Sequence, residues 1–303
     1  MADLSSAKLI AVDWGTTRLR ARLVDAAGAV LAEAASDDGI GALNGSGHEA
    51  AFEALVAAWP AVPAIMAGMV GSRQGWREAA YVPCPADAAA IAAAMTRFET
   101  QRRRPVAIVP GLRAGERDVM RGEETQIVGL IDAETAFAGS VVLPGTHSKW
   151  AKVERGTIAD FASFISGELF ALLARQSFLR HSVADPNDTG DVSASADFRA
   201  GAERARDVPF AATLFSVRVR YLLADAKPAD NLAYLSGLVI GGEIAAAVSL
   251  GLARSPVRIV AAPALARAYR AALAVFGIEA EVRDGDATAL AGLMRLARAA
   301  GML

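Results

Sequence analysis

One local pattern occurs twice in this chain of 303 residues, and it limits the folds that the chain can adopt. In each copy an apolar strand runs into a turn that contains Gly and Thr, and a second strand follows directly. The first turn is Asp13–Thr17 and the second is Gly145–Ser148. Roughly 130 residues separate the turns, whereas solenoid repeats recur about every 20–50 residues. The pattern therefore predicts two related α/β halves with a ligand site in the cleft between them.

The segments around the two turns predict a mixture of strands and helices in both halves. We expect the boundary near Ala133–Ala138, which gives one domain at residues 1–135 and another at 136–303. Strands are predicted at Lys8–Trp14, Arg18–Asp25, Ala29–Ala34, Pro63–Met69, Pro105–Val109, Gly139–Leu143, Trp150–Glu154, Thr157–Phe161, Val257–Ala261 and Glu279–Val282. Helices are predicted at Gly47–Trp59, Asp87–Phe98, Gly167–Leu179, Ser195–Arg204, Ala211–Ala224, Leu232–Leu250, Pro263–Phe276 and Asp286–Ala299, and one opens at "GEETQ".

Composition excludes several classes of protein. Hydrophobic residues make up 53% of the chain and the formal net charge is −2, so no basic excess points to nucleic acid or to an anionic membrane. The single cysteine, Cys84, cannot form an internal disulfide or a cysteine-rich zinc site, which favours a reducing compartment. The N-terminus lacks a signal-peptide pattern, and charges interrupt the apolar segments before they reach membrane-spanning length. We therefore expect a cytoplasmic protein.

The two Gly-Thr turns could hold phosphate groups. A Gly after a strand allows close approach of the backbone to a ligand, and backbone N–H groups with Thr hydroxyls can surround phosphate oxygens. Asp13, at the end of the first strand, could hold Mg²⁺ through water. The alternative at both turns is a plain polar hairpin, which at the second turn would carry solvated lysines.

Other segments offer carboxylates and donors. Asp118–Gln126 could supply a general base, or it could be a helix start whose acidic residues complement the helix dipole. In Met69–Trp76, Arg73 and Gln74 could bind a carboxylate or sugar hydroxyls, although an ordinary loop is the alternative. Trp14, Trp76 and Trp150 lie in Gly-rich segments, which suggests pocket walls. Small residues in Ser236–Ala247 and Val257–Leu273 could approach a nucleoside ring or serve helix packing; no zinc ligand spacing, P-loop or dinucleotide fingerprint is present.

The order of these segments resembles the sugar kinase/heat-shock ATPase/actin superfamily. The strings "AVDWGTTRLRA", "MAGMVGSRQGW", "DVMRGEETQIVG", "LPGTHSKW" and "FASFISGELFALL" are similar to the 2-dehydro-3-deoxygalactonokinase family, from Ala11 to about Gly292. The resemblance implies an α/β fold with two ribonuclease H-like (actin-like ATPase) domains, each a mixed sheet with flanking helices. It also implies a carbohydrate kinase that uses ATP and Mg²⁺ to phosphorylate the 6-hydroxyl of 2-dehydro-3-deoxygalactonate in galactonate catabolism.

The resemblance also implies roles for single residues. The metal residue would be Asp13, and the base would be Glu123, Glu124 or Asp118. Glu123 is favoured because it follows Gly122 as the base follows Gly in related kinases, and neighbouring helical residues point about 100° apart. The residues expected to bind the ATP phosphates are Gly15, Thr16, Thr17, Gly145, Thr146 and His147; those expected to bind the substrate are Arg18, Arg20, Ser72, Arg73, Gln74, Trp76, Lys149 and Trp150; those expected to bind the nucleoside are Gly241, Gly242 and Pro263.

Two other functions are compatible with the sequence. One is a kinase of the same fold for another sugar acid, such as 2-dehydro-3-deoxygluconate. The other is an actin-like ATPase that is not a kinase, although a filament protein would not need Arg73, Gln74 and Trp76 in its cleft. The expected partners are a small sugar acid and ATP, without nucleic acid or membrane. The sequence leaves the oligomeric state open, with a homodimer among the arrangements considered.

Overall fold

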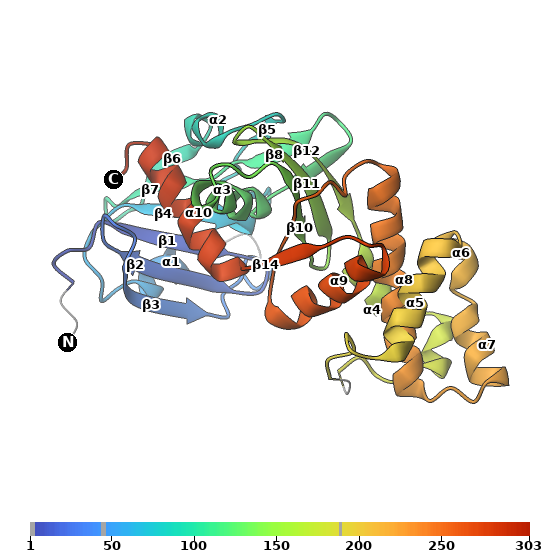
Figure 1. The fold of residues 1–303 in the computed structure, drawn as a ribbon. Helices are drawn as coiled ribbons and strands as arrows, with labels where there is room; N and C mark the ends of the chain where they lie inside the picture. The colour runs from blue at the N-terminus through green and yellow to red at the C-terminus, as the bar shows by residue number, and fades with distance from the viewer. Residues whose placement is uncertain (1–3, 44–46, 188–189) are drawn as a thin grey trace. The chain divides into compact units, whose positions relative to one another are not determined.

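The computed structural model of the chain describes residues 4–43, 47–187 and 190–303 (Figure 1). The chain divides into two compact units. Unit 1 contains the residues up to Phe137 together with Glu154–Asp160 and Gly285–Leu303, and unit 2 contains Ala138–Val153 and Phe161–Asp284. This division differs from a single boundary after residue 135, because two later segments return to unit 1.

The last helix returns to unit 1 by close helix packing. Helix α10 (Gly285–Ala299) lies beside α3 (Glu123–Ala133), as Figure 1 shows. A Cβ atom on Gly129 of α3 would overlap the backbone oxygen of Thr288, and a Cβ on Gly292 of α10 would overlap that of Thr125. The two glycines therefore let the helix backbones approach each other more closely than larger residues would allow.

Unit 1 is built on a six-stranded sheet with the order β3-β2-β1-β4-β7-β6. Strands β1, β4 and β7 are parallel to their neighbours in this set, whereas β2, β3 and β6 pair antiparallel. The strands of this sheet are β1 (Leu9–Trp14), β2 (Leu19–Val24), β3 (Val30–Ser36), β4 (Ala64–Gly68), β6 (Thr96–Glu99) and β7 (Pro105–Ile108). The remaining elements are α1 (His48–Leu55), the 3₁₀ turn η1 (Met69–Gly71), α2 (Ala88–Ala93), and a small sheet of β5 (Tyr81–Pro83), β8 (Gly111–Ala114) and β9 (Asp118–Met120).

One sequence-based prediction in unit 1 was wrong, and one small sheet was missed. The helix expected at Asp87–Phe98 ends at Ala93, and Thr96–Glu99 forms β6 instead. The Asp87 side chain caps α2 by accepting a hydrogen bond from Ala90 N at 2.8 Å, but β-branched and aromatic residues follow, and these favour a strand. The small sheet β5-β8-β9 was not predicted at all, because its strands have only three or four residues each.

Unit 2 repeats the arrangement of unit 1. Its sheet has the order β12-β11-β10-β13-β14, in which β10 pairs antiparallel with β11 and parallel with β13, as β1 does with β2 and β4. The strands are β10 (Gly139–Leu143), β11 (Ser148–Glu154), β12 (Thr157–Phe164), β13 (Val257–Ala261) and β14 (Ala280–Asp284). The helices are α4 (Ser166–Arg175), η2 (Phe178–Ser182), α5 (Ala196–Asp207), α6 (Phe210–Thr213), α7 (Ser216–Leu223), α8 (Pro228–Ser249) and α9 (Pro263–Val275).

Helix α8 is the central helix of unit 2. By length and composition it could span a membrane, contrary to the expectation that charges interrupt every apolar segment, and in the structure 67% of its most apolar window is buried. It packs against α5 so closely that a Cβ on Gly237 would overlap the backbone oxygen of Phe198. Its apolar side chains therefore meet those of other helices, as in the core helix of a globular domain.

Candidate active site

The first Gly-Thr turn is held by backbone hydrogen bonds at the end of β1. Gly15 N donates to Arg18 O at 2.9 Å, which closes the turn into β2. A second segment fixes it from outside, since Ile40 N donates to Gly15 O at 3.0 Å and Gly41 N donates to Thr16 O at 2.9 Å. The Thr16 and Thr17 side chains remain exposed, so this loop presents two hydroxyl residues on a rigid backbone.

Asp13 lines a cavity of about 210 Å³ in unit 1. Its strand β1 runs parallel to β4, and the register places it beside Ala67, so both strands end at the same edge. Gly68 follows with a φ of 96°, and a Cβ there would lie 2.8 Å from Trp14 O. Glycine is therefore required where the ends of the two strands meet beside the carboxylate.

Charged neighbours surround Asp13. Arg20, its register partner on β2, lies 3.9 Å from its carboxylate and 3.4 Å from that of Asp286 at the start of α10. Loss of solvent around the group raises the pKa of Asp13; Arg20 opposes this effect, Asp286 adds to it, and Arg22 opposes it. The site thus combines two carboxylates with arginines at the edge of the sheet.

The start of α3 brings one of the three candidate bases into the same cavity. Glu123 lines it together with Asp13, and its Oε2 accepts a hydrogen bond from Arg121 N at 3.1 Å. Asp118 lies in β9, where its Oδ1 accepts from Val119 N at 2.7 Å, and it is not among the residues that line the cavity. The structure therefore groups Asp13 with Glu123 and not with Asp118.

Glu124 has a different environment from Glu123. Its side chain has no solvent exposure, and Oε2 accepts a hydrogen bond from Gly122 N at 2.7 Å while the Thr125 hydroxyl donates to Oε1 at 3.1 Å. Burial, followed by the charge of Glu123, raises the pKa of Glu124 to about 8. Glu124 thus makes hydrogen bonds at the start of α3. Neighbouring helical residues point about 100° apart, which predicts that only one of the two glutamates faces the cavity.

The second Gly-Thr turn joins β10 to β11 in unit 2, and helix α4 packs against it. Glu168 N donates to Thr146 O at 3.1 Å, and the Glu168 carboxylate lies 2.7 Å from His147 Nε2. A Cβ on Gly167 would overlap the backbone of Gly145, so α4 can approach the turn only with glycine there. The sequence analysis missed Glu168, although its place in the first turn of a predicted helix was a signal.

A buried glutamate fixes the strand that follows this turn. Glu243 of α8 is 4% exposed, and its Oε1 accepts hydrogen bonds from Ser148 Oγ and Trp150 Nε1, both at 2.7 Å. The Tyr269 hydroxyl donates to Oε2 at 2.8 Å. Burial raises the pKa of Glu243, and its hydrogen bonds, which include one with Ser166, oppose the rise. The sequence analysis missed this residue, because its donors are far away along the chain.

Comparisons with known proteins identify the family. A probable 2-dehydro-3-deoxygalactonokinase from Rhizobium meliloti (strain 1021) is 39% identical over 297 residues, which cover 95% of this chain and 96% of that protein. The 2-dehydro-3-deoxygalactonokinase of Escherichia coli (strain K12) is 33% identical over 300 residues, which cover 97% and 99%. The 2-keto-3-deoxy-galactonokinase family matches residues 13–296. This chain belongs to that family. Its members are carbohydrate kinases, so the resemblance described from the sequence is confirmed.

Solved structures support the same assignment. A provisionally named 2-dehydro-3-deoxygalactonokinase from Sinorhizobium meliloti has a TM-score of 0.89 at 40% identity, over 96% of this chain and 98% of that one. The activator of 2-hydroxyisocaproyl-CoA dehydratase from Clostridium difficile, with bound ADPNP, has a TM-score of 0.57 at 13% identity over 97% and 95%, and it supports the fold alone. The predicted α/β fold of the actin-like ATPase class is confirmed.

The arginines expected to bind substrate in this kinase have carboxylate partners. Arg18 pairs with Asp37 at 3.3 Å, and Arg73 pairs with Glu78 at 3.3 Å while its side chain is 86% exposed. Gln74 beside it is also exposed. Ser72 is buried, and its hydroxyl has no hydrogen-bond partner. None of these residues lines the cavity that holds Asp13 and Glu123.

Two of the three tryptophans do not form pocket walls as expected. Trp14 and Trp150 have no solvent exposure, whereas Trp76 is partly buried and packs edge-on against Trp14, with ring centroids 6.2 Å apart. Each buried indole N–H has an acceptor, namely Asp38 O for Trp14 at 2.8 Å and the Glu243 carboxylate for Trp150. The Gly-rich turns leave room for large side chains to point inward, so these residues are core residues, and we do not retain Trp150 as a substrate contact.

The nucleoside candidates fall into two groups. Pro263 is exposed at the start of α9, directly after β13, whose carboxyl end lies beside that of β10 and therefore beside the second turn. Gly241 and Gly242 lie within α8, where a Cβ would lie 2.9 Å from Ala202 Cα and 2.5 Å from the Phe210 ring respectively. Helix packing therefore explains both glycines, and only Pro263 lies at the sheet edge where ligands bind in open α/β folds.

Two basic residues, Lys149 and Arg121, lie near the turn of unit 2 and in the cavity of unit 1 respectively. Lys149 of β11 is 5% exposed, and its Nζ donates to His147 O at 3.3 Å, so it supports the second turn from within. Arg121, which the sequence analysis did not single out, lines the cavity with Asp13 and Glu123. No local pattern distinguished Arg121 from the chain's many other arginines.

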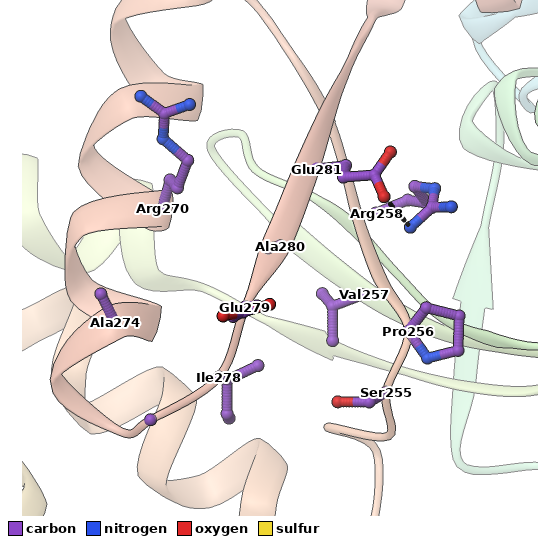
Figure 2. A pocket seen from close by; sticks show the side chains of 11 residues that line it. Ser255, Pro256, Val257, Arg258, Arg270, Ala274, Ile278, Glu279, Ala280 and Glu281 are labelled. Atoms are coloured by element: carbon purple, nitrogen blue, oxygen red, sulfur yellow. Dashed lines mark ion pairs between the residues drawn. The ribbon is translucent and has the colours of Figure 1, made fainter.

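A larger cavity, of about 840 Å³, lies elsewhere in unit 2 (Figure 2). Its walls come from the amino ends of β13 and β14 and from the last two turns of α9, and Figure 2 shows Arg258 directed at Glu281, 3.3 Å away. Parallel α/β sheets bind ligands at the carboxyl ends of their strands. This cavity is at the opposite ends of β13 and β14, so its size does not make it the active site.

Proposed function

We propose that this family member transfers the γ-phosphoryl group of ATP to the 6-hydroxyl of 2-dehydro-3-deoxygalactonate. The observation that carries the proposal is that Asp13 and Glu123 line one cavity at the ends of β1 and β4. Phosphoryl transfer requires a metal-positioning group and a carboxylate that orients the attacking hydroxyl. The relatives named above supply the choice of sugar acid.

Each loop has a role in this proposal. Gly15, Thr16 and Thr17 bind phosphate oxygens through backbone N–H groups and hydroxyls, and Gly145, Thr146 and His147 have the same proposed role. The backbone and carboxylate contacts that hold both loops keep these donors in place before ATP binds. Preorganised donors cost no rearrangement when charge develops in the transition state. Pro263 lies beside the nucleoside in this arrangement.

Asp13 positions Mg²⁺. Within residues 4–43, 47–187 and 190–303 no three His, Cys, Asp or Glu side chains are grouped as a metal cage. One carboxylate suits Mg²⁺, which keeps most of its water ligands and completes its shell with substrate phosphates. Bound there, Mg²⁺ would neutralise the charge that develops on the phosphates. Asp286 lies close enough to influence the Asp13 charge and adds negative potential.

Glu123 acts as the general base. It accepts the hydrogen bond of the 6-hydroxyl and takes its proton as the new O–P bond forms and the bond from the γ-phosphorus to the leaving oxygen of ADP breaks. The loose transition state requires mainly that the hydroxyl lie in line, so the carboxylate contributes chiefly by orienting the hydroxyl. Glu124 and Asp118 take no part in this step.

A direct assay tests the proposal. ADP release is measured with purified protein, ATP and Mg²⁺, in the presence of 2-dehydro-3-deoxygalactonate, of its gluconate epimer, or of no sugar acid. We expect the first to give the highest kcat/KM and the last only a trace. Preference for the epimer would reassign the substrate, and equal ADP release without any sugar acid would favour an ATPase that is not a kinase.

Two properties of the whole protein extend the proposal. We place the reaction in the cytoplasm, where ATP and Mg²⁺ are present and where a free thiol such as Cys84 stays reduced. A homodimer is the proposed assembly. Light scattering after size exclusion, at several protein concentrations, gives the mass that tests it.

A further inference from the structure

The cavity that holds Asp13 and Glu123 contains one cationic side chain among the described residues that line it. That side chain is Arg121, directly before Gly122 and the start of α3. A sugar acid is an anion at neutral pH, and two carboxylates in the wall would repel it. A cation in the same wall is therefore the feature that would allow an acid rather than a neutral sugar to bind.

Arg121 is held firmly but carries no counter-charge. Its Nη2 donates to Ala79 O at 2.7 Å, and its guanidinium lies 4.3 Å from the centroid of the Tyr81 ring. A Cβ on Gly71 would lie 2.7 Å from Nη1, so glycine leaves the space that the guanidinium uses. The Nε and Nη1 atoms are buried and have no hydrogen-bond partner. Within the described residues the contacts of its guanidinium are with a carbonyl and a ring, not with a carboxylate.

The other arginines near the first turn differ in this respect. Arg18, Arg20 and Arg73 each lie within 3.4 Å of a carboxylate, on Asp37, Asp286 and Glu78 respectively. A substrate carboxylate would have to compete with those partners, and it would meet Arg18 and Arg73 in a solvent-exposed setting where an ion pair contributes little. At Arg121 it would find a cation that no side-chain carboxylate neutralises, on a residue that lines the same cavity as Asp13 and Glu123, which favours charge-assisted hydrogen bonds.

We propose that Arg121 binds the carboxylate of the sugar acid and selects acids over neutral sugars. This inference rests on the proposed kinase function, which it deepens by placing the two ends of the substrate. The guanidinium extends towards Ala79 and Tyr81, whereas Glu123 begins α3. In the proposed arrangement the carboxylate lies at the guanidinium and the 6-hydroxyl lies at Glu123.

The test compares Arg121→Gln with two other arginine variants. Charge-assisted hydrogen bonds of this kind correspond to roughly a 10- to 100-fold change in binding. We expect Arg121→Gln to raise KM for the sugar acid by that factor and to leave KM for ATP unchanged. Arg73→Gln tests the rival carboxylate site and should change neither. Arg77→Gln is a matched control, since Arg77 also lies over an aromatic ring, 5.4 Å from the Phe98 centroid, but outside the cavity.

Two further readouts separate binding from a structural role. The amide of the sugar acid, which lacks the charge, should be used as well by Arg121→Gln as by the unmodified protein, so selectivity for the acid should fall. In Arg121→Ala, added guanidinium ion should lower KM for the acid, and it should have no such effect on Arg77→Ala. A variant that loses thermal stability and uses acid and amide equally poorly, without rescue, would show that Arg121 only supports the fold.

The failure of this inference can be distinguished from that of the kinase proposal. If the unmodified protein phosphorylates no sugar acid, the proposed function is wrong whatever Arg121 does. If it phosphorylates the acid and Arg121→Gln keeps the same KM and the same selectivity over the amide, the kinase proposal stands and Arg121 is not the anchor. A rise in KM confined to Arg73→Gln would move the carboxylate to that residue.

Discussion

The environment of Glu124 gives a quantitative prediction about stability. Burial raises its pKa from 4.5 to about 8 in the folded protein, whereas the unfolded chain keeps a value near 4.5. The folded state therefore binds the proton on Glu124 more tightly than the unfolded chain does. The stability that this group contributes is fully present below pH 4.5 and is lost as pH rises towards 8. The difference between the two pKa values corresponds to a loss in the free energy of unfolding, relative to acidic pH, of about 5 kcal/mol above pH 8 and about 3 kcal/mol at pH 7.

Glu124→Gln should remove this dependence on pH. The amide has the shape of the protonated acid, so its oxygen can accept from Gly122 N and its NH₂ group can face the Thr125 hydroxyl. Urea unfolding at several values between pH 5 and pH 9 measures the effect. We expect the variant and the unmodified protein to have similar free energies of unfolding at pH 5, and the variant to become the more stable one as pH rises.

The neighbouring residue provides the control. The charge of Glu123 is the second cause of the raised pKa, so Glu123→Gln should make the decline with pH shallower without abolishing it. Activity should rank the other way, since Glu123→Gln removes the proposed base and should lower kcat by about 10²- to 10⁴-fold. Glu124→Gln should keep most of the turnover. Parallel stability curves for the unmodified protein and Glu124→Gln, or a larger loss of kcat in Glu124→Gln, would refute this account of the two carboxylates.

Three further predictions concern residues that border the two Gly-Thr turns or the cavity that contains Asp13. Asp13→Asn should fold normally but lose most turnover even at saturating Mg²⁺, as steady-state kinetics with a Mg²⁺ titration would reveal. Gly68→Ala should lower the free energy of unfolding by about 1–3 kcal/mol, because a φ of 96° and the nearby Trp14 oxygen both oppose a side chain; chemical denaturation measures it. Glu168→Gln weakens the 2.7 Å contact with His147 and should raise KM for ATP while KM for the sugar acid stays constant.

The sequence predicted the parts of the site that depend on local geometry. The two strand–turn–strand units follow from apolar runs broken by Gly and Thr, and both turns have the predicted form. The angle between neighbouring helical residues was enough to predict that Glu123 and Glu124 would face different surroundings, as they do. Which of them is the base stays a prediction.

The features that the sequence could not predict depend on partners far along the chain. The sequence analysis favoured Arg73 and did not single out Arg121, and only the structure shows that Arg73 faces Glu78 whereas the Arg121 guanidinium faces a carbonyl and a ring. Trp150 seemed to be a pocket residue because its neighbours are small and polar, but its buried acceptor, Glu243, lies 93 residues later. Pairing over such distances leaves no periodic signal in either segment.

The two turns also differ in a way that bears on their chemistry. Two residues before the glycine of each turn, the first has Asp13 and the second has Leu143, which is almost fully buried. The carboxylate therefore belongs to one half only, although the strand order around both turns is the same. A second carboxylate at Leu143 would add negative charge beside phosphates that already repel each other, whereas a single Mg²⁺ needs only one or two carboxylates. The duplicated fold thus supplies two proposed phosphate loops, and the single Asp gives the proposed metal role to the first of them.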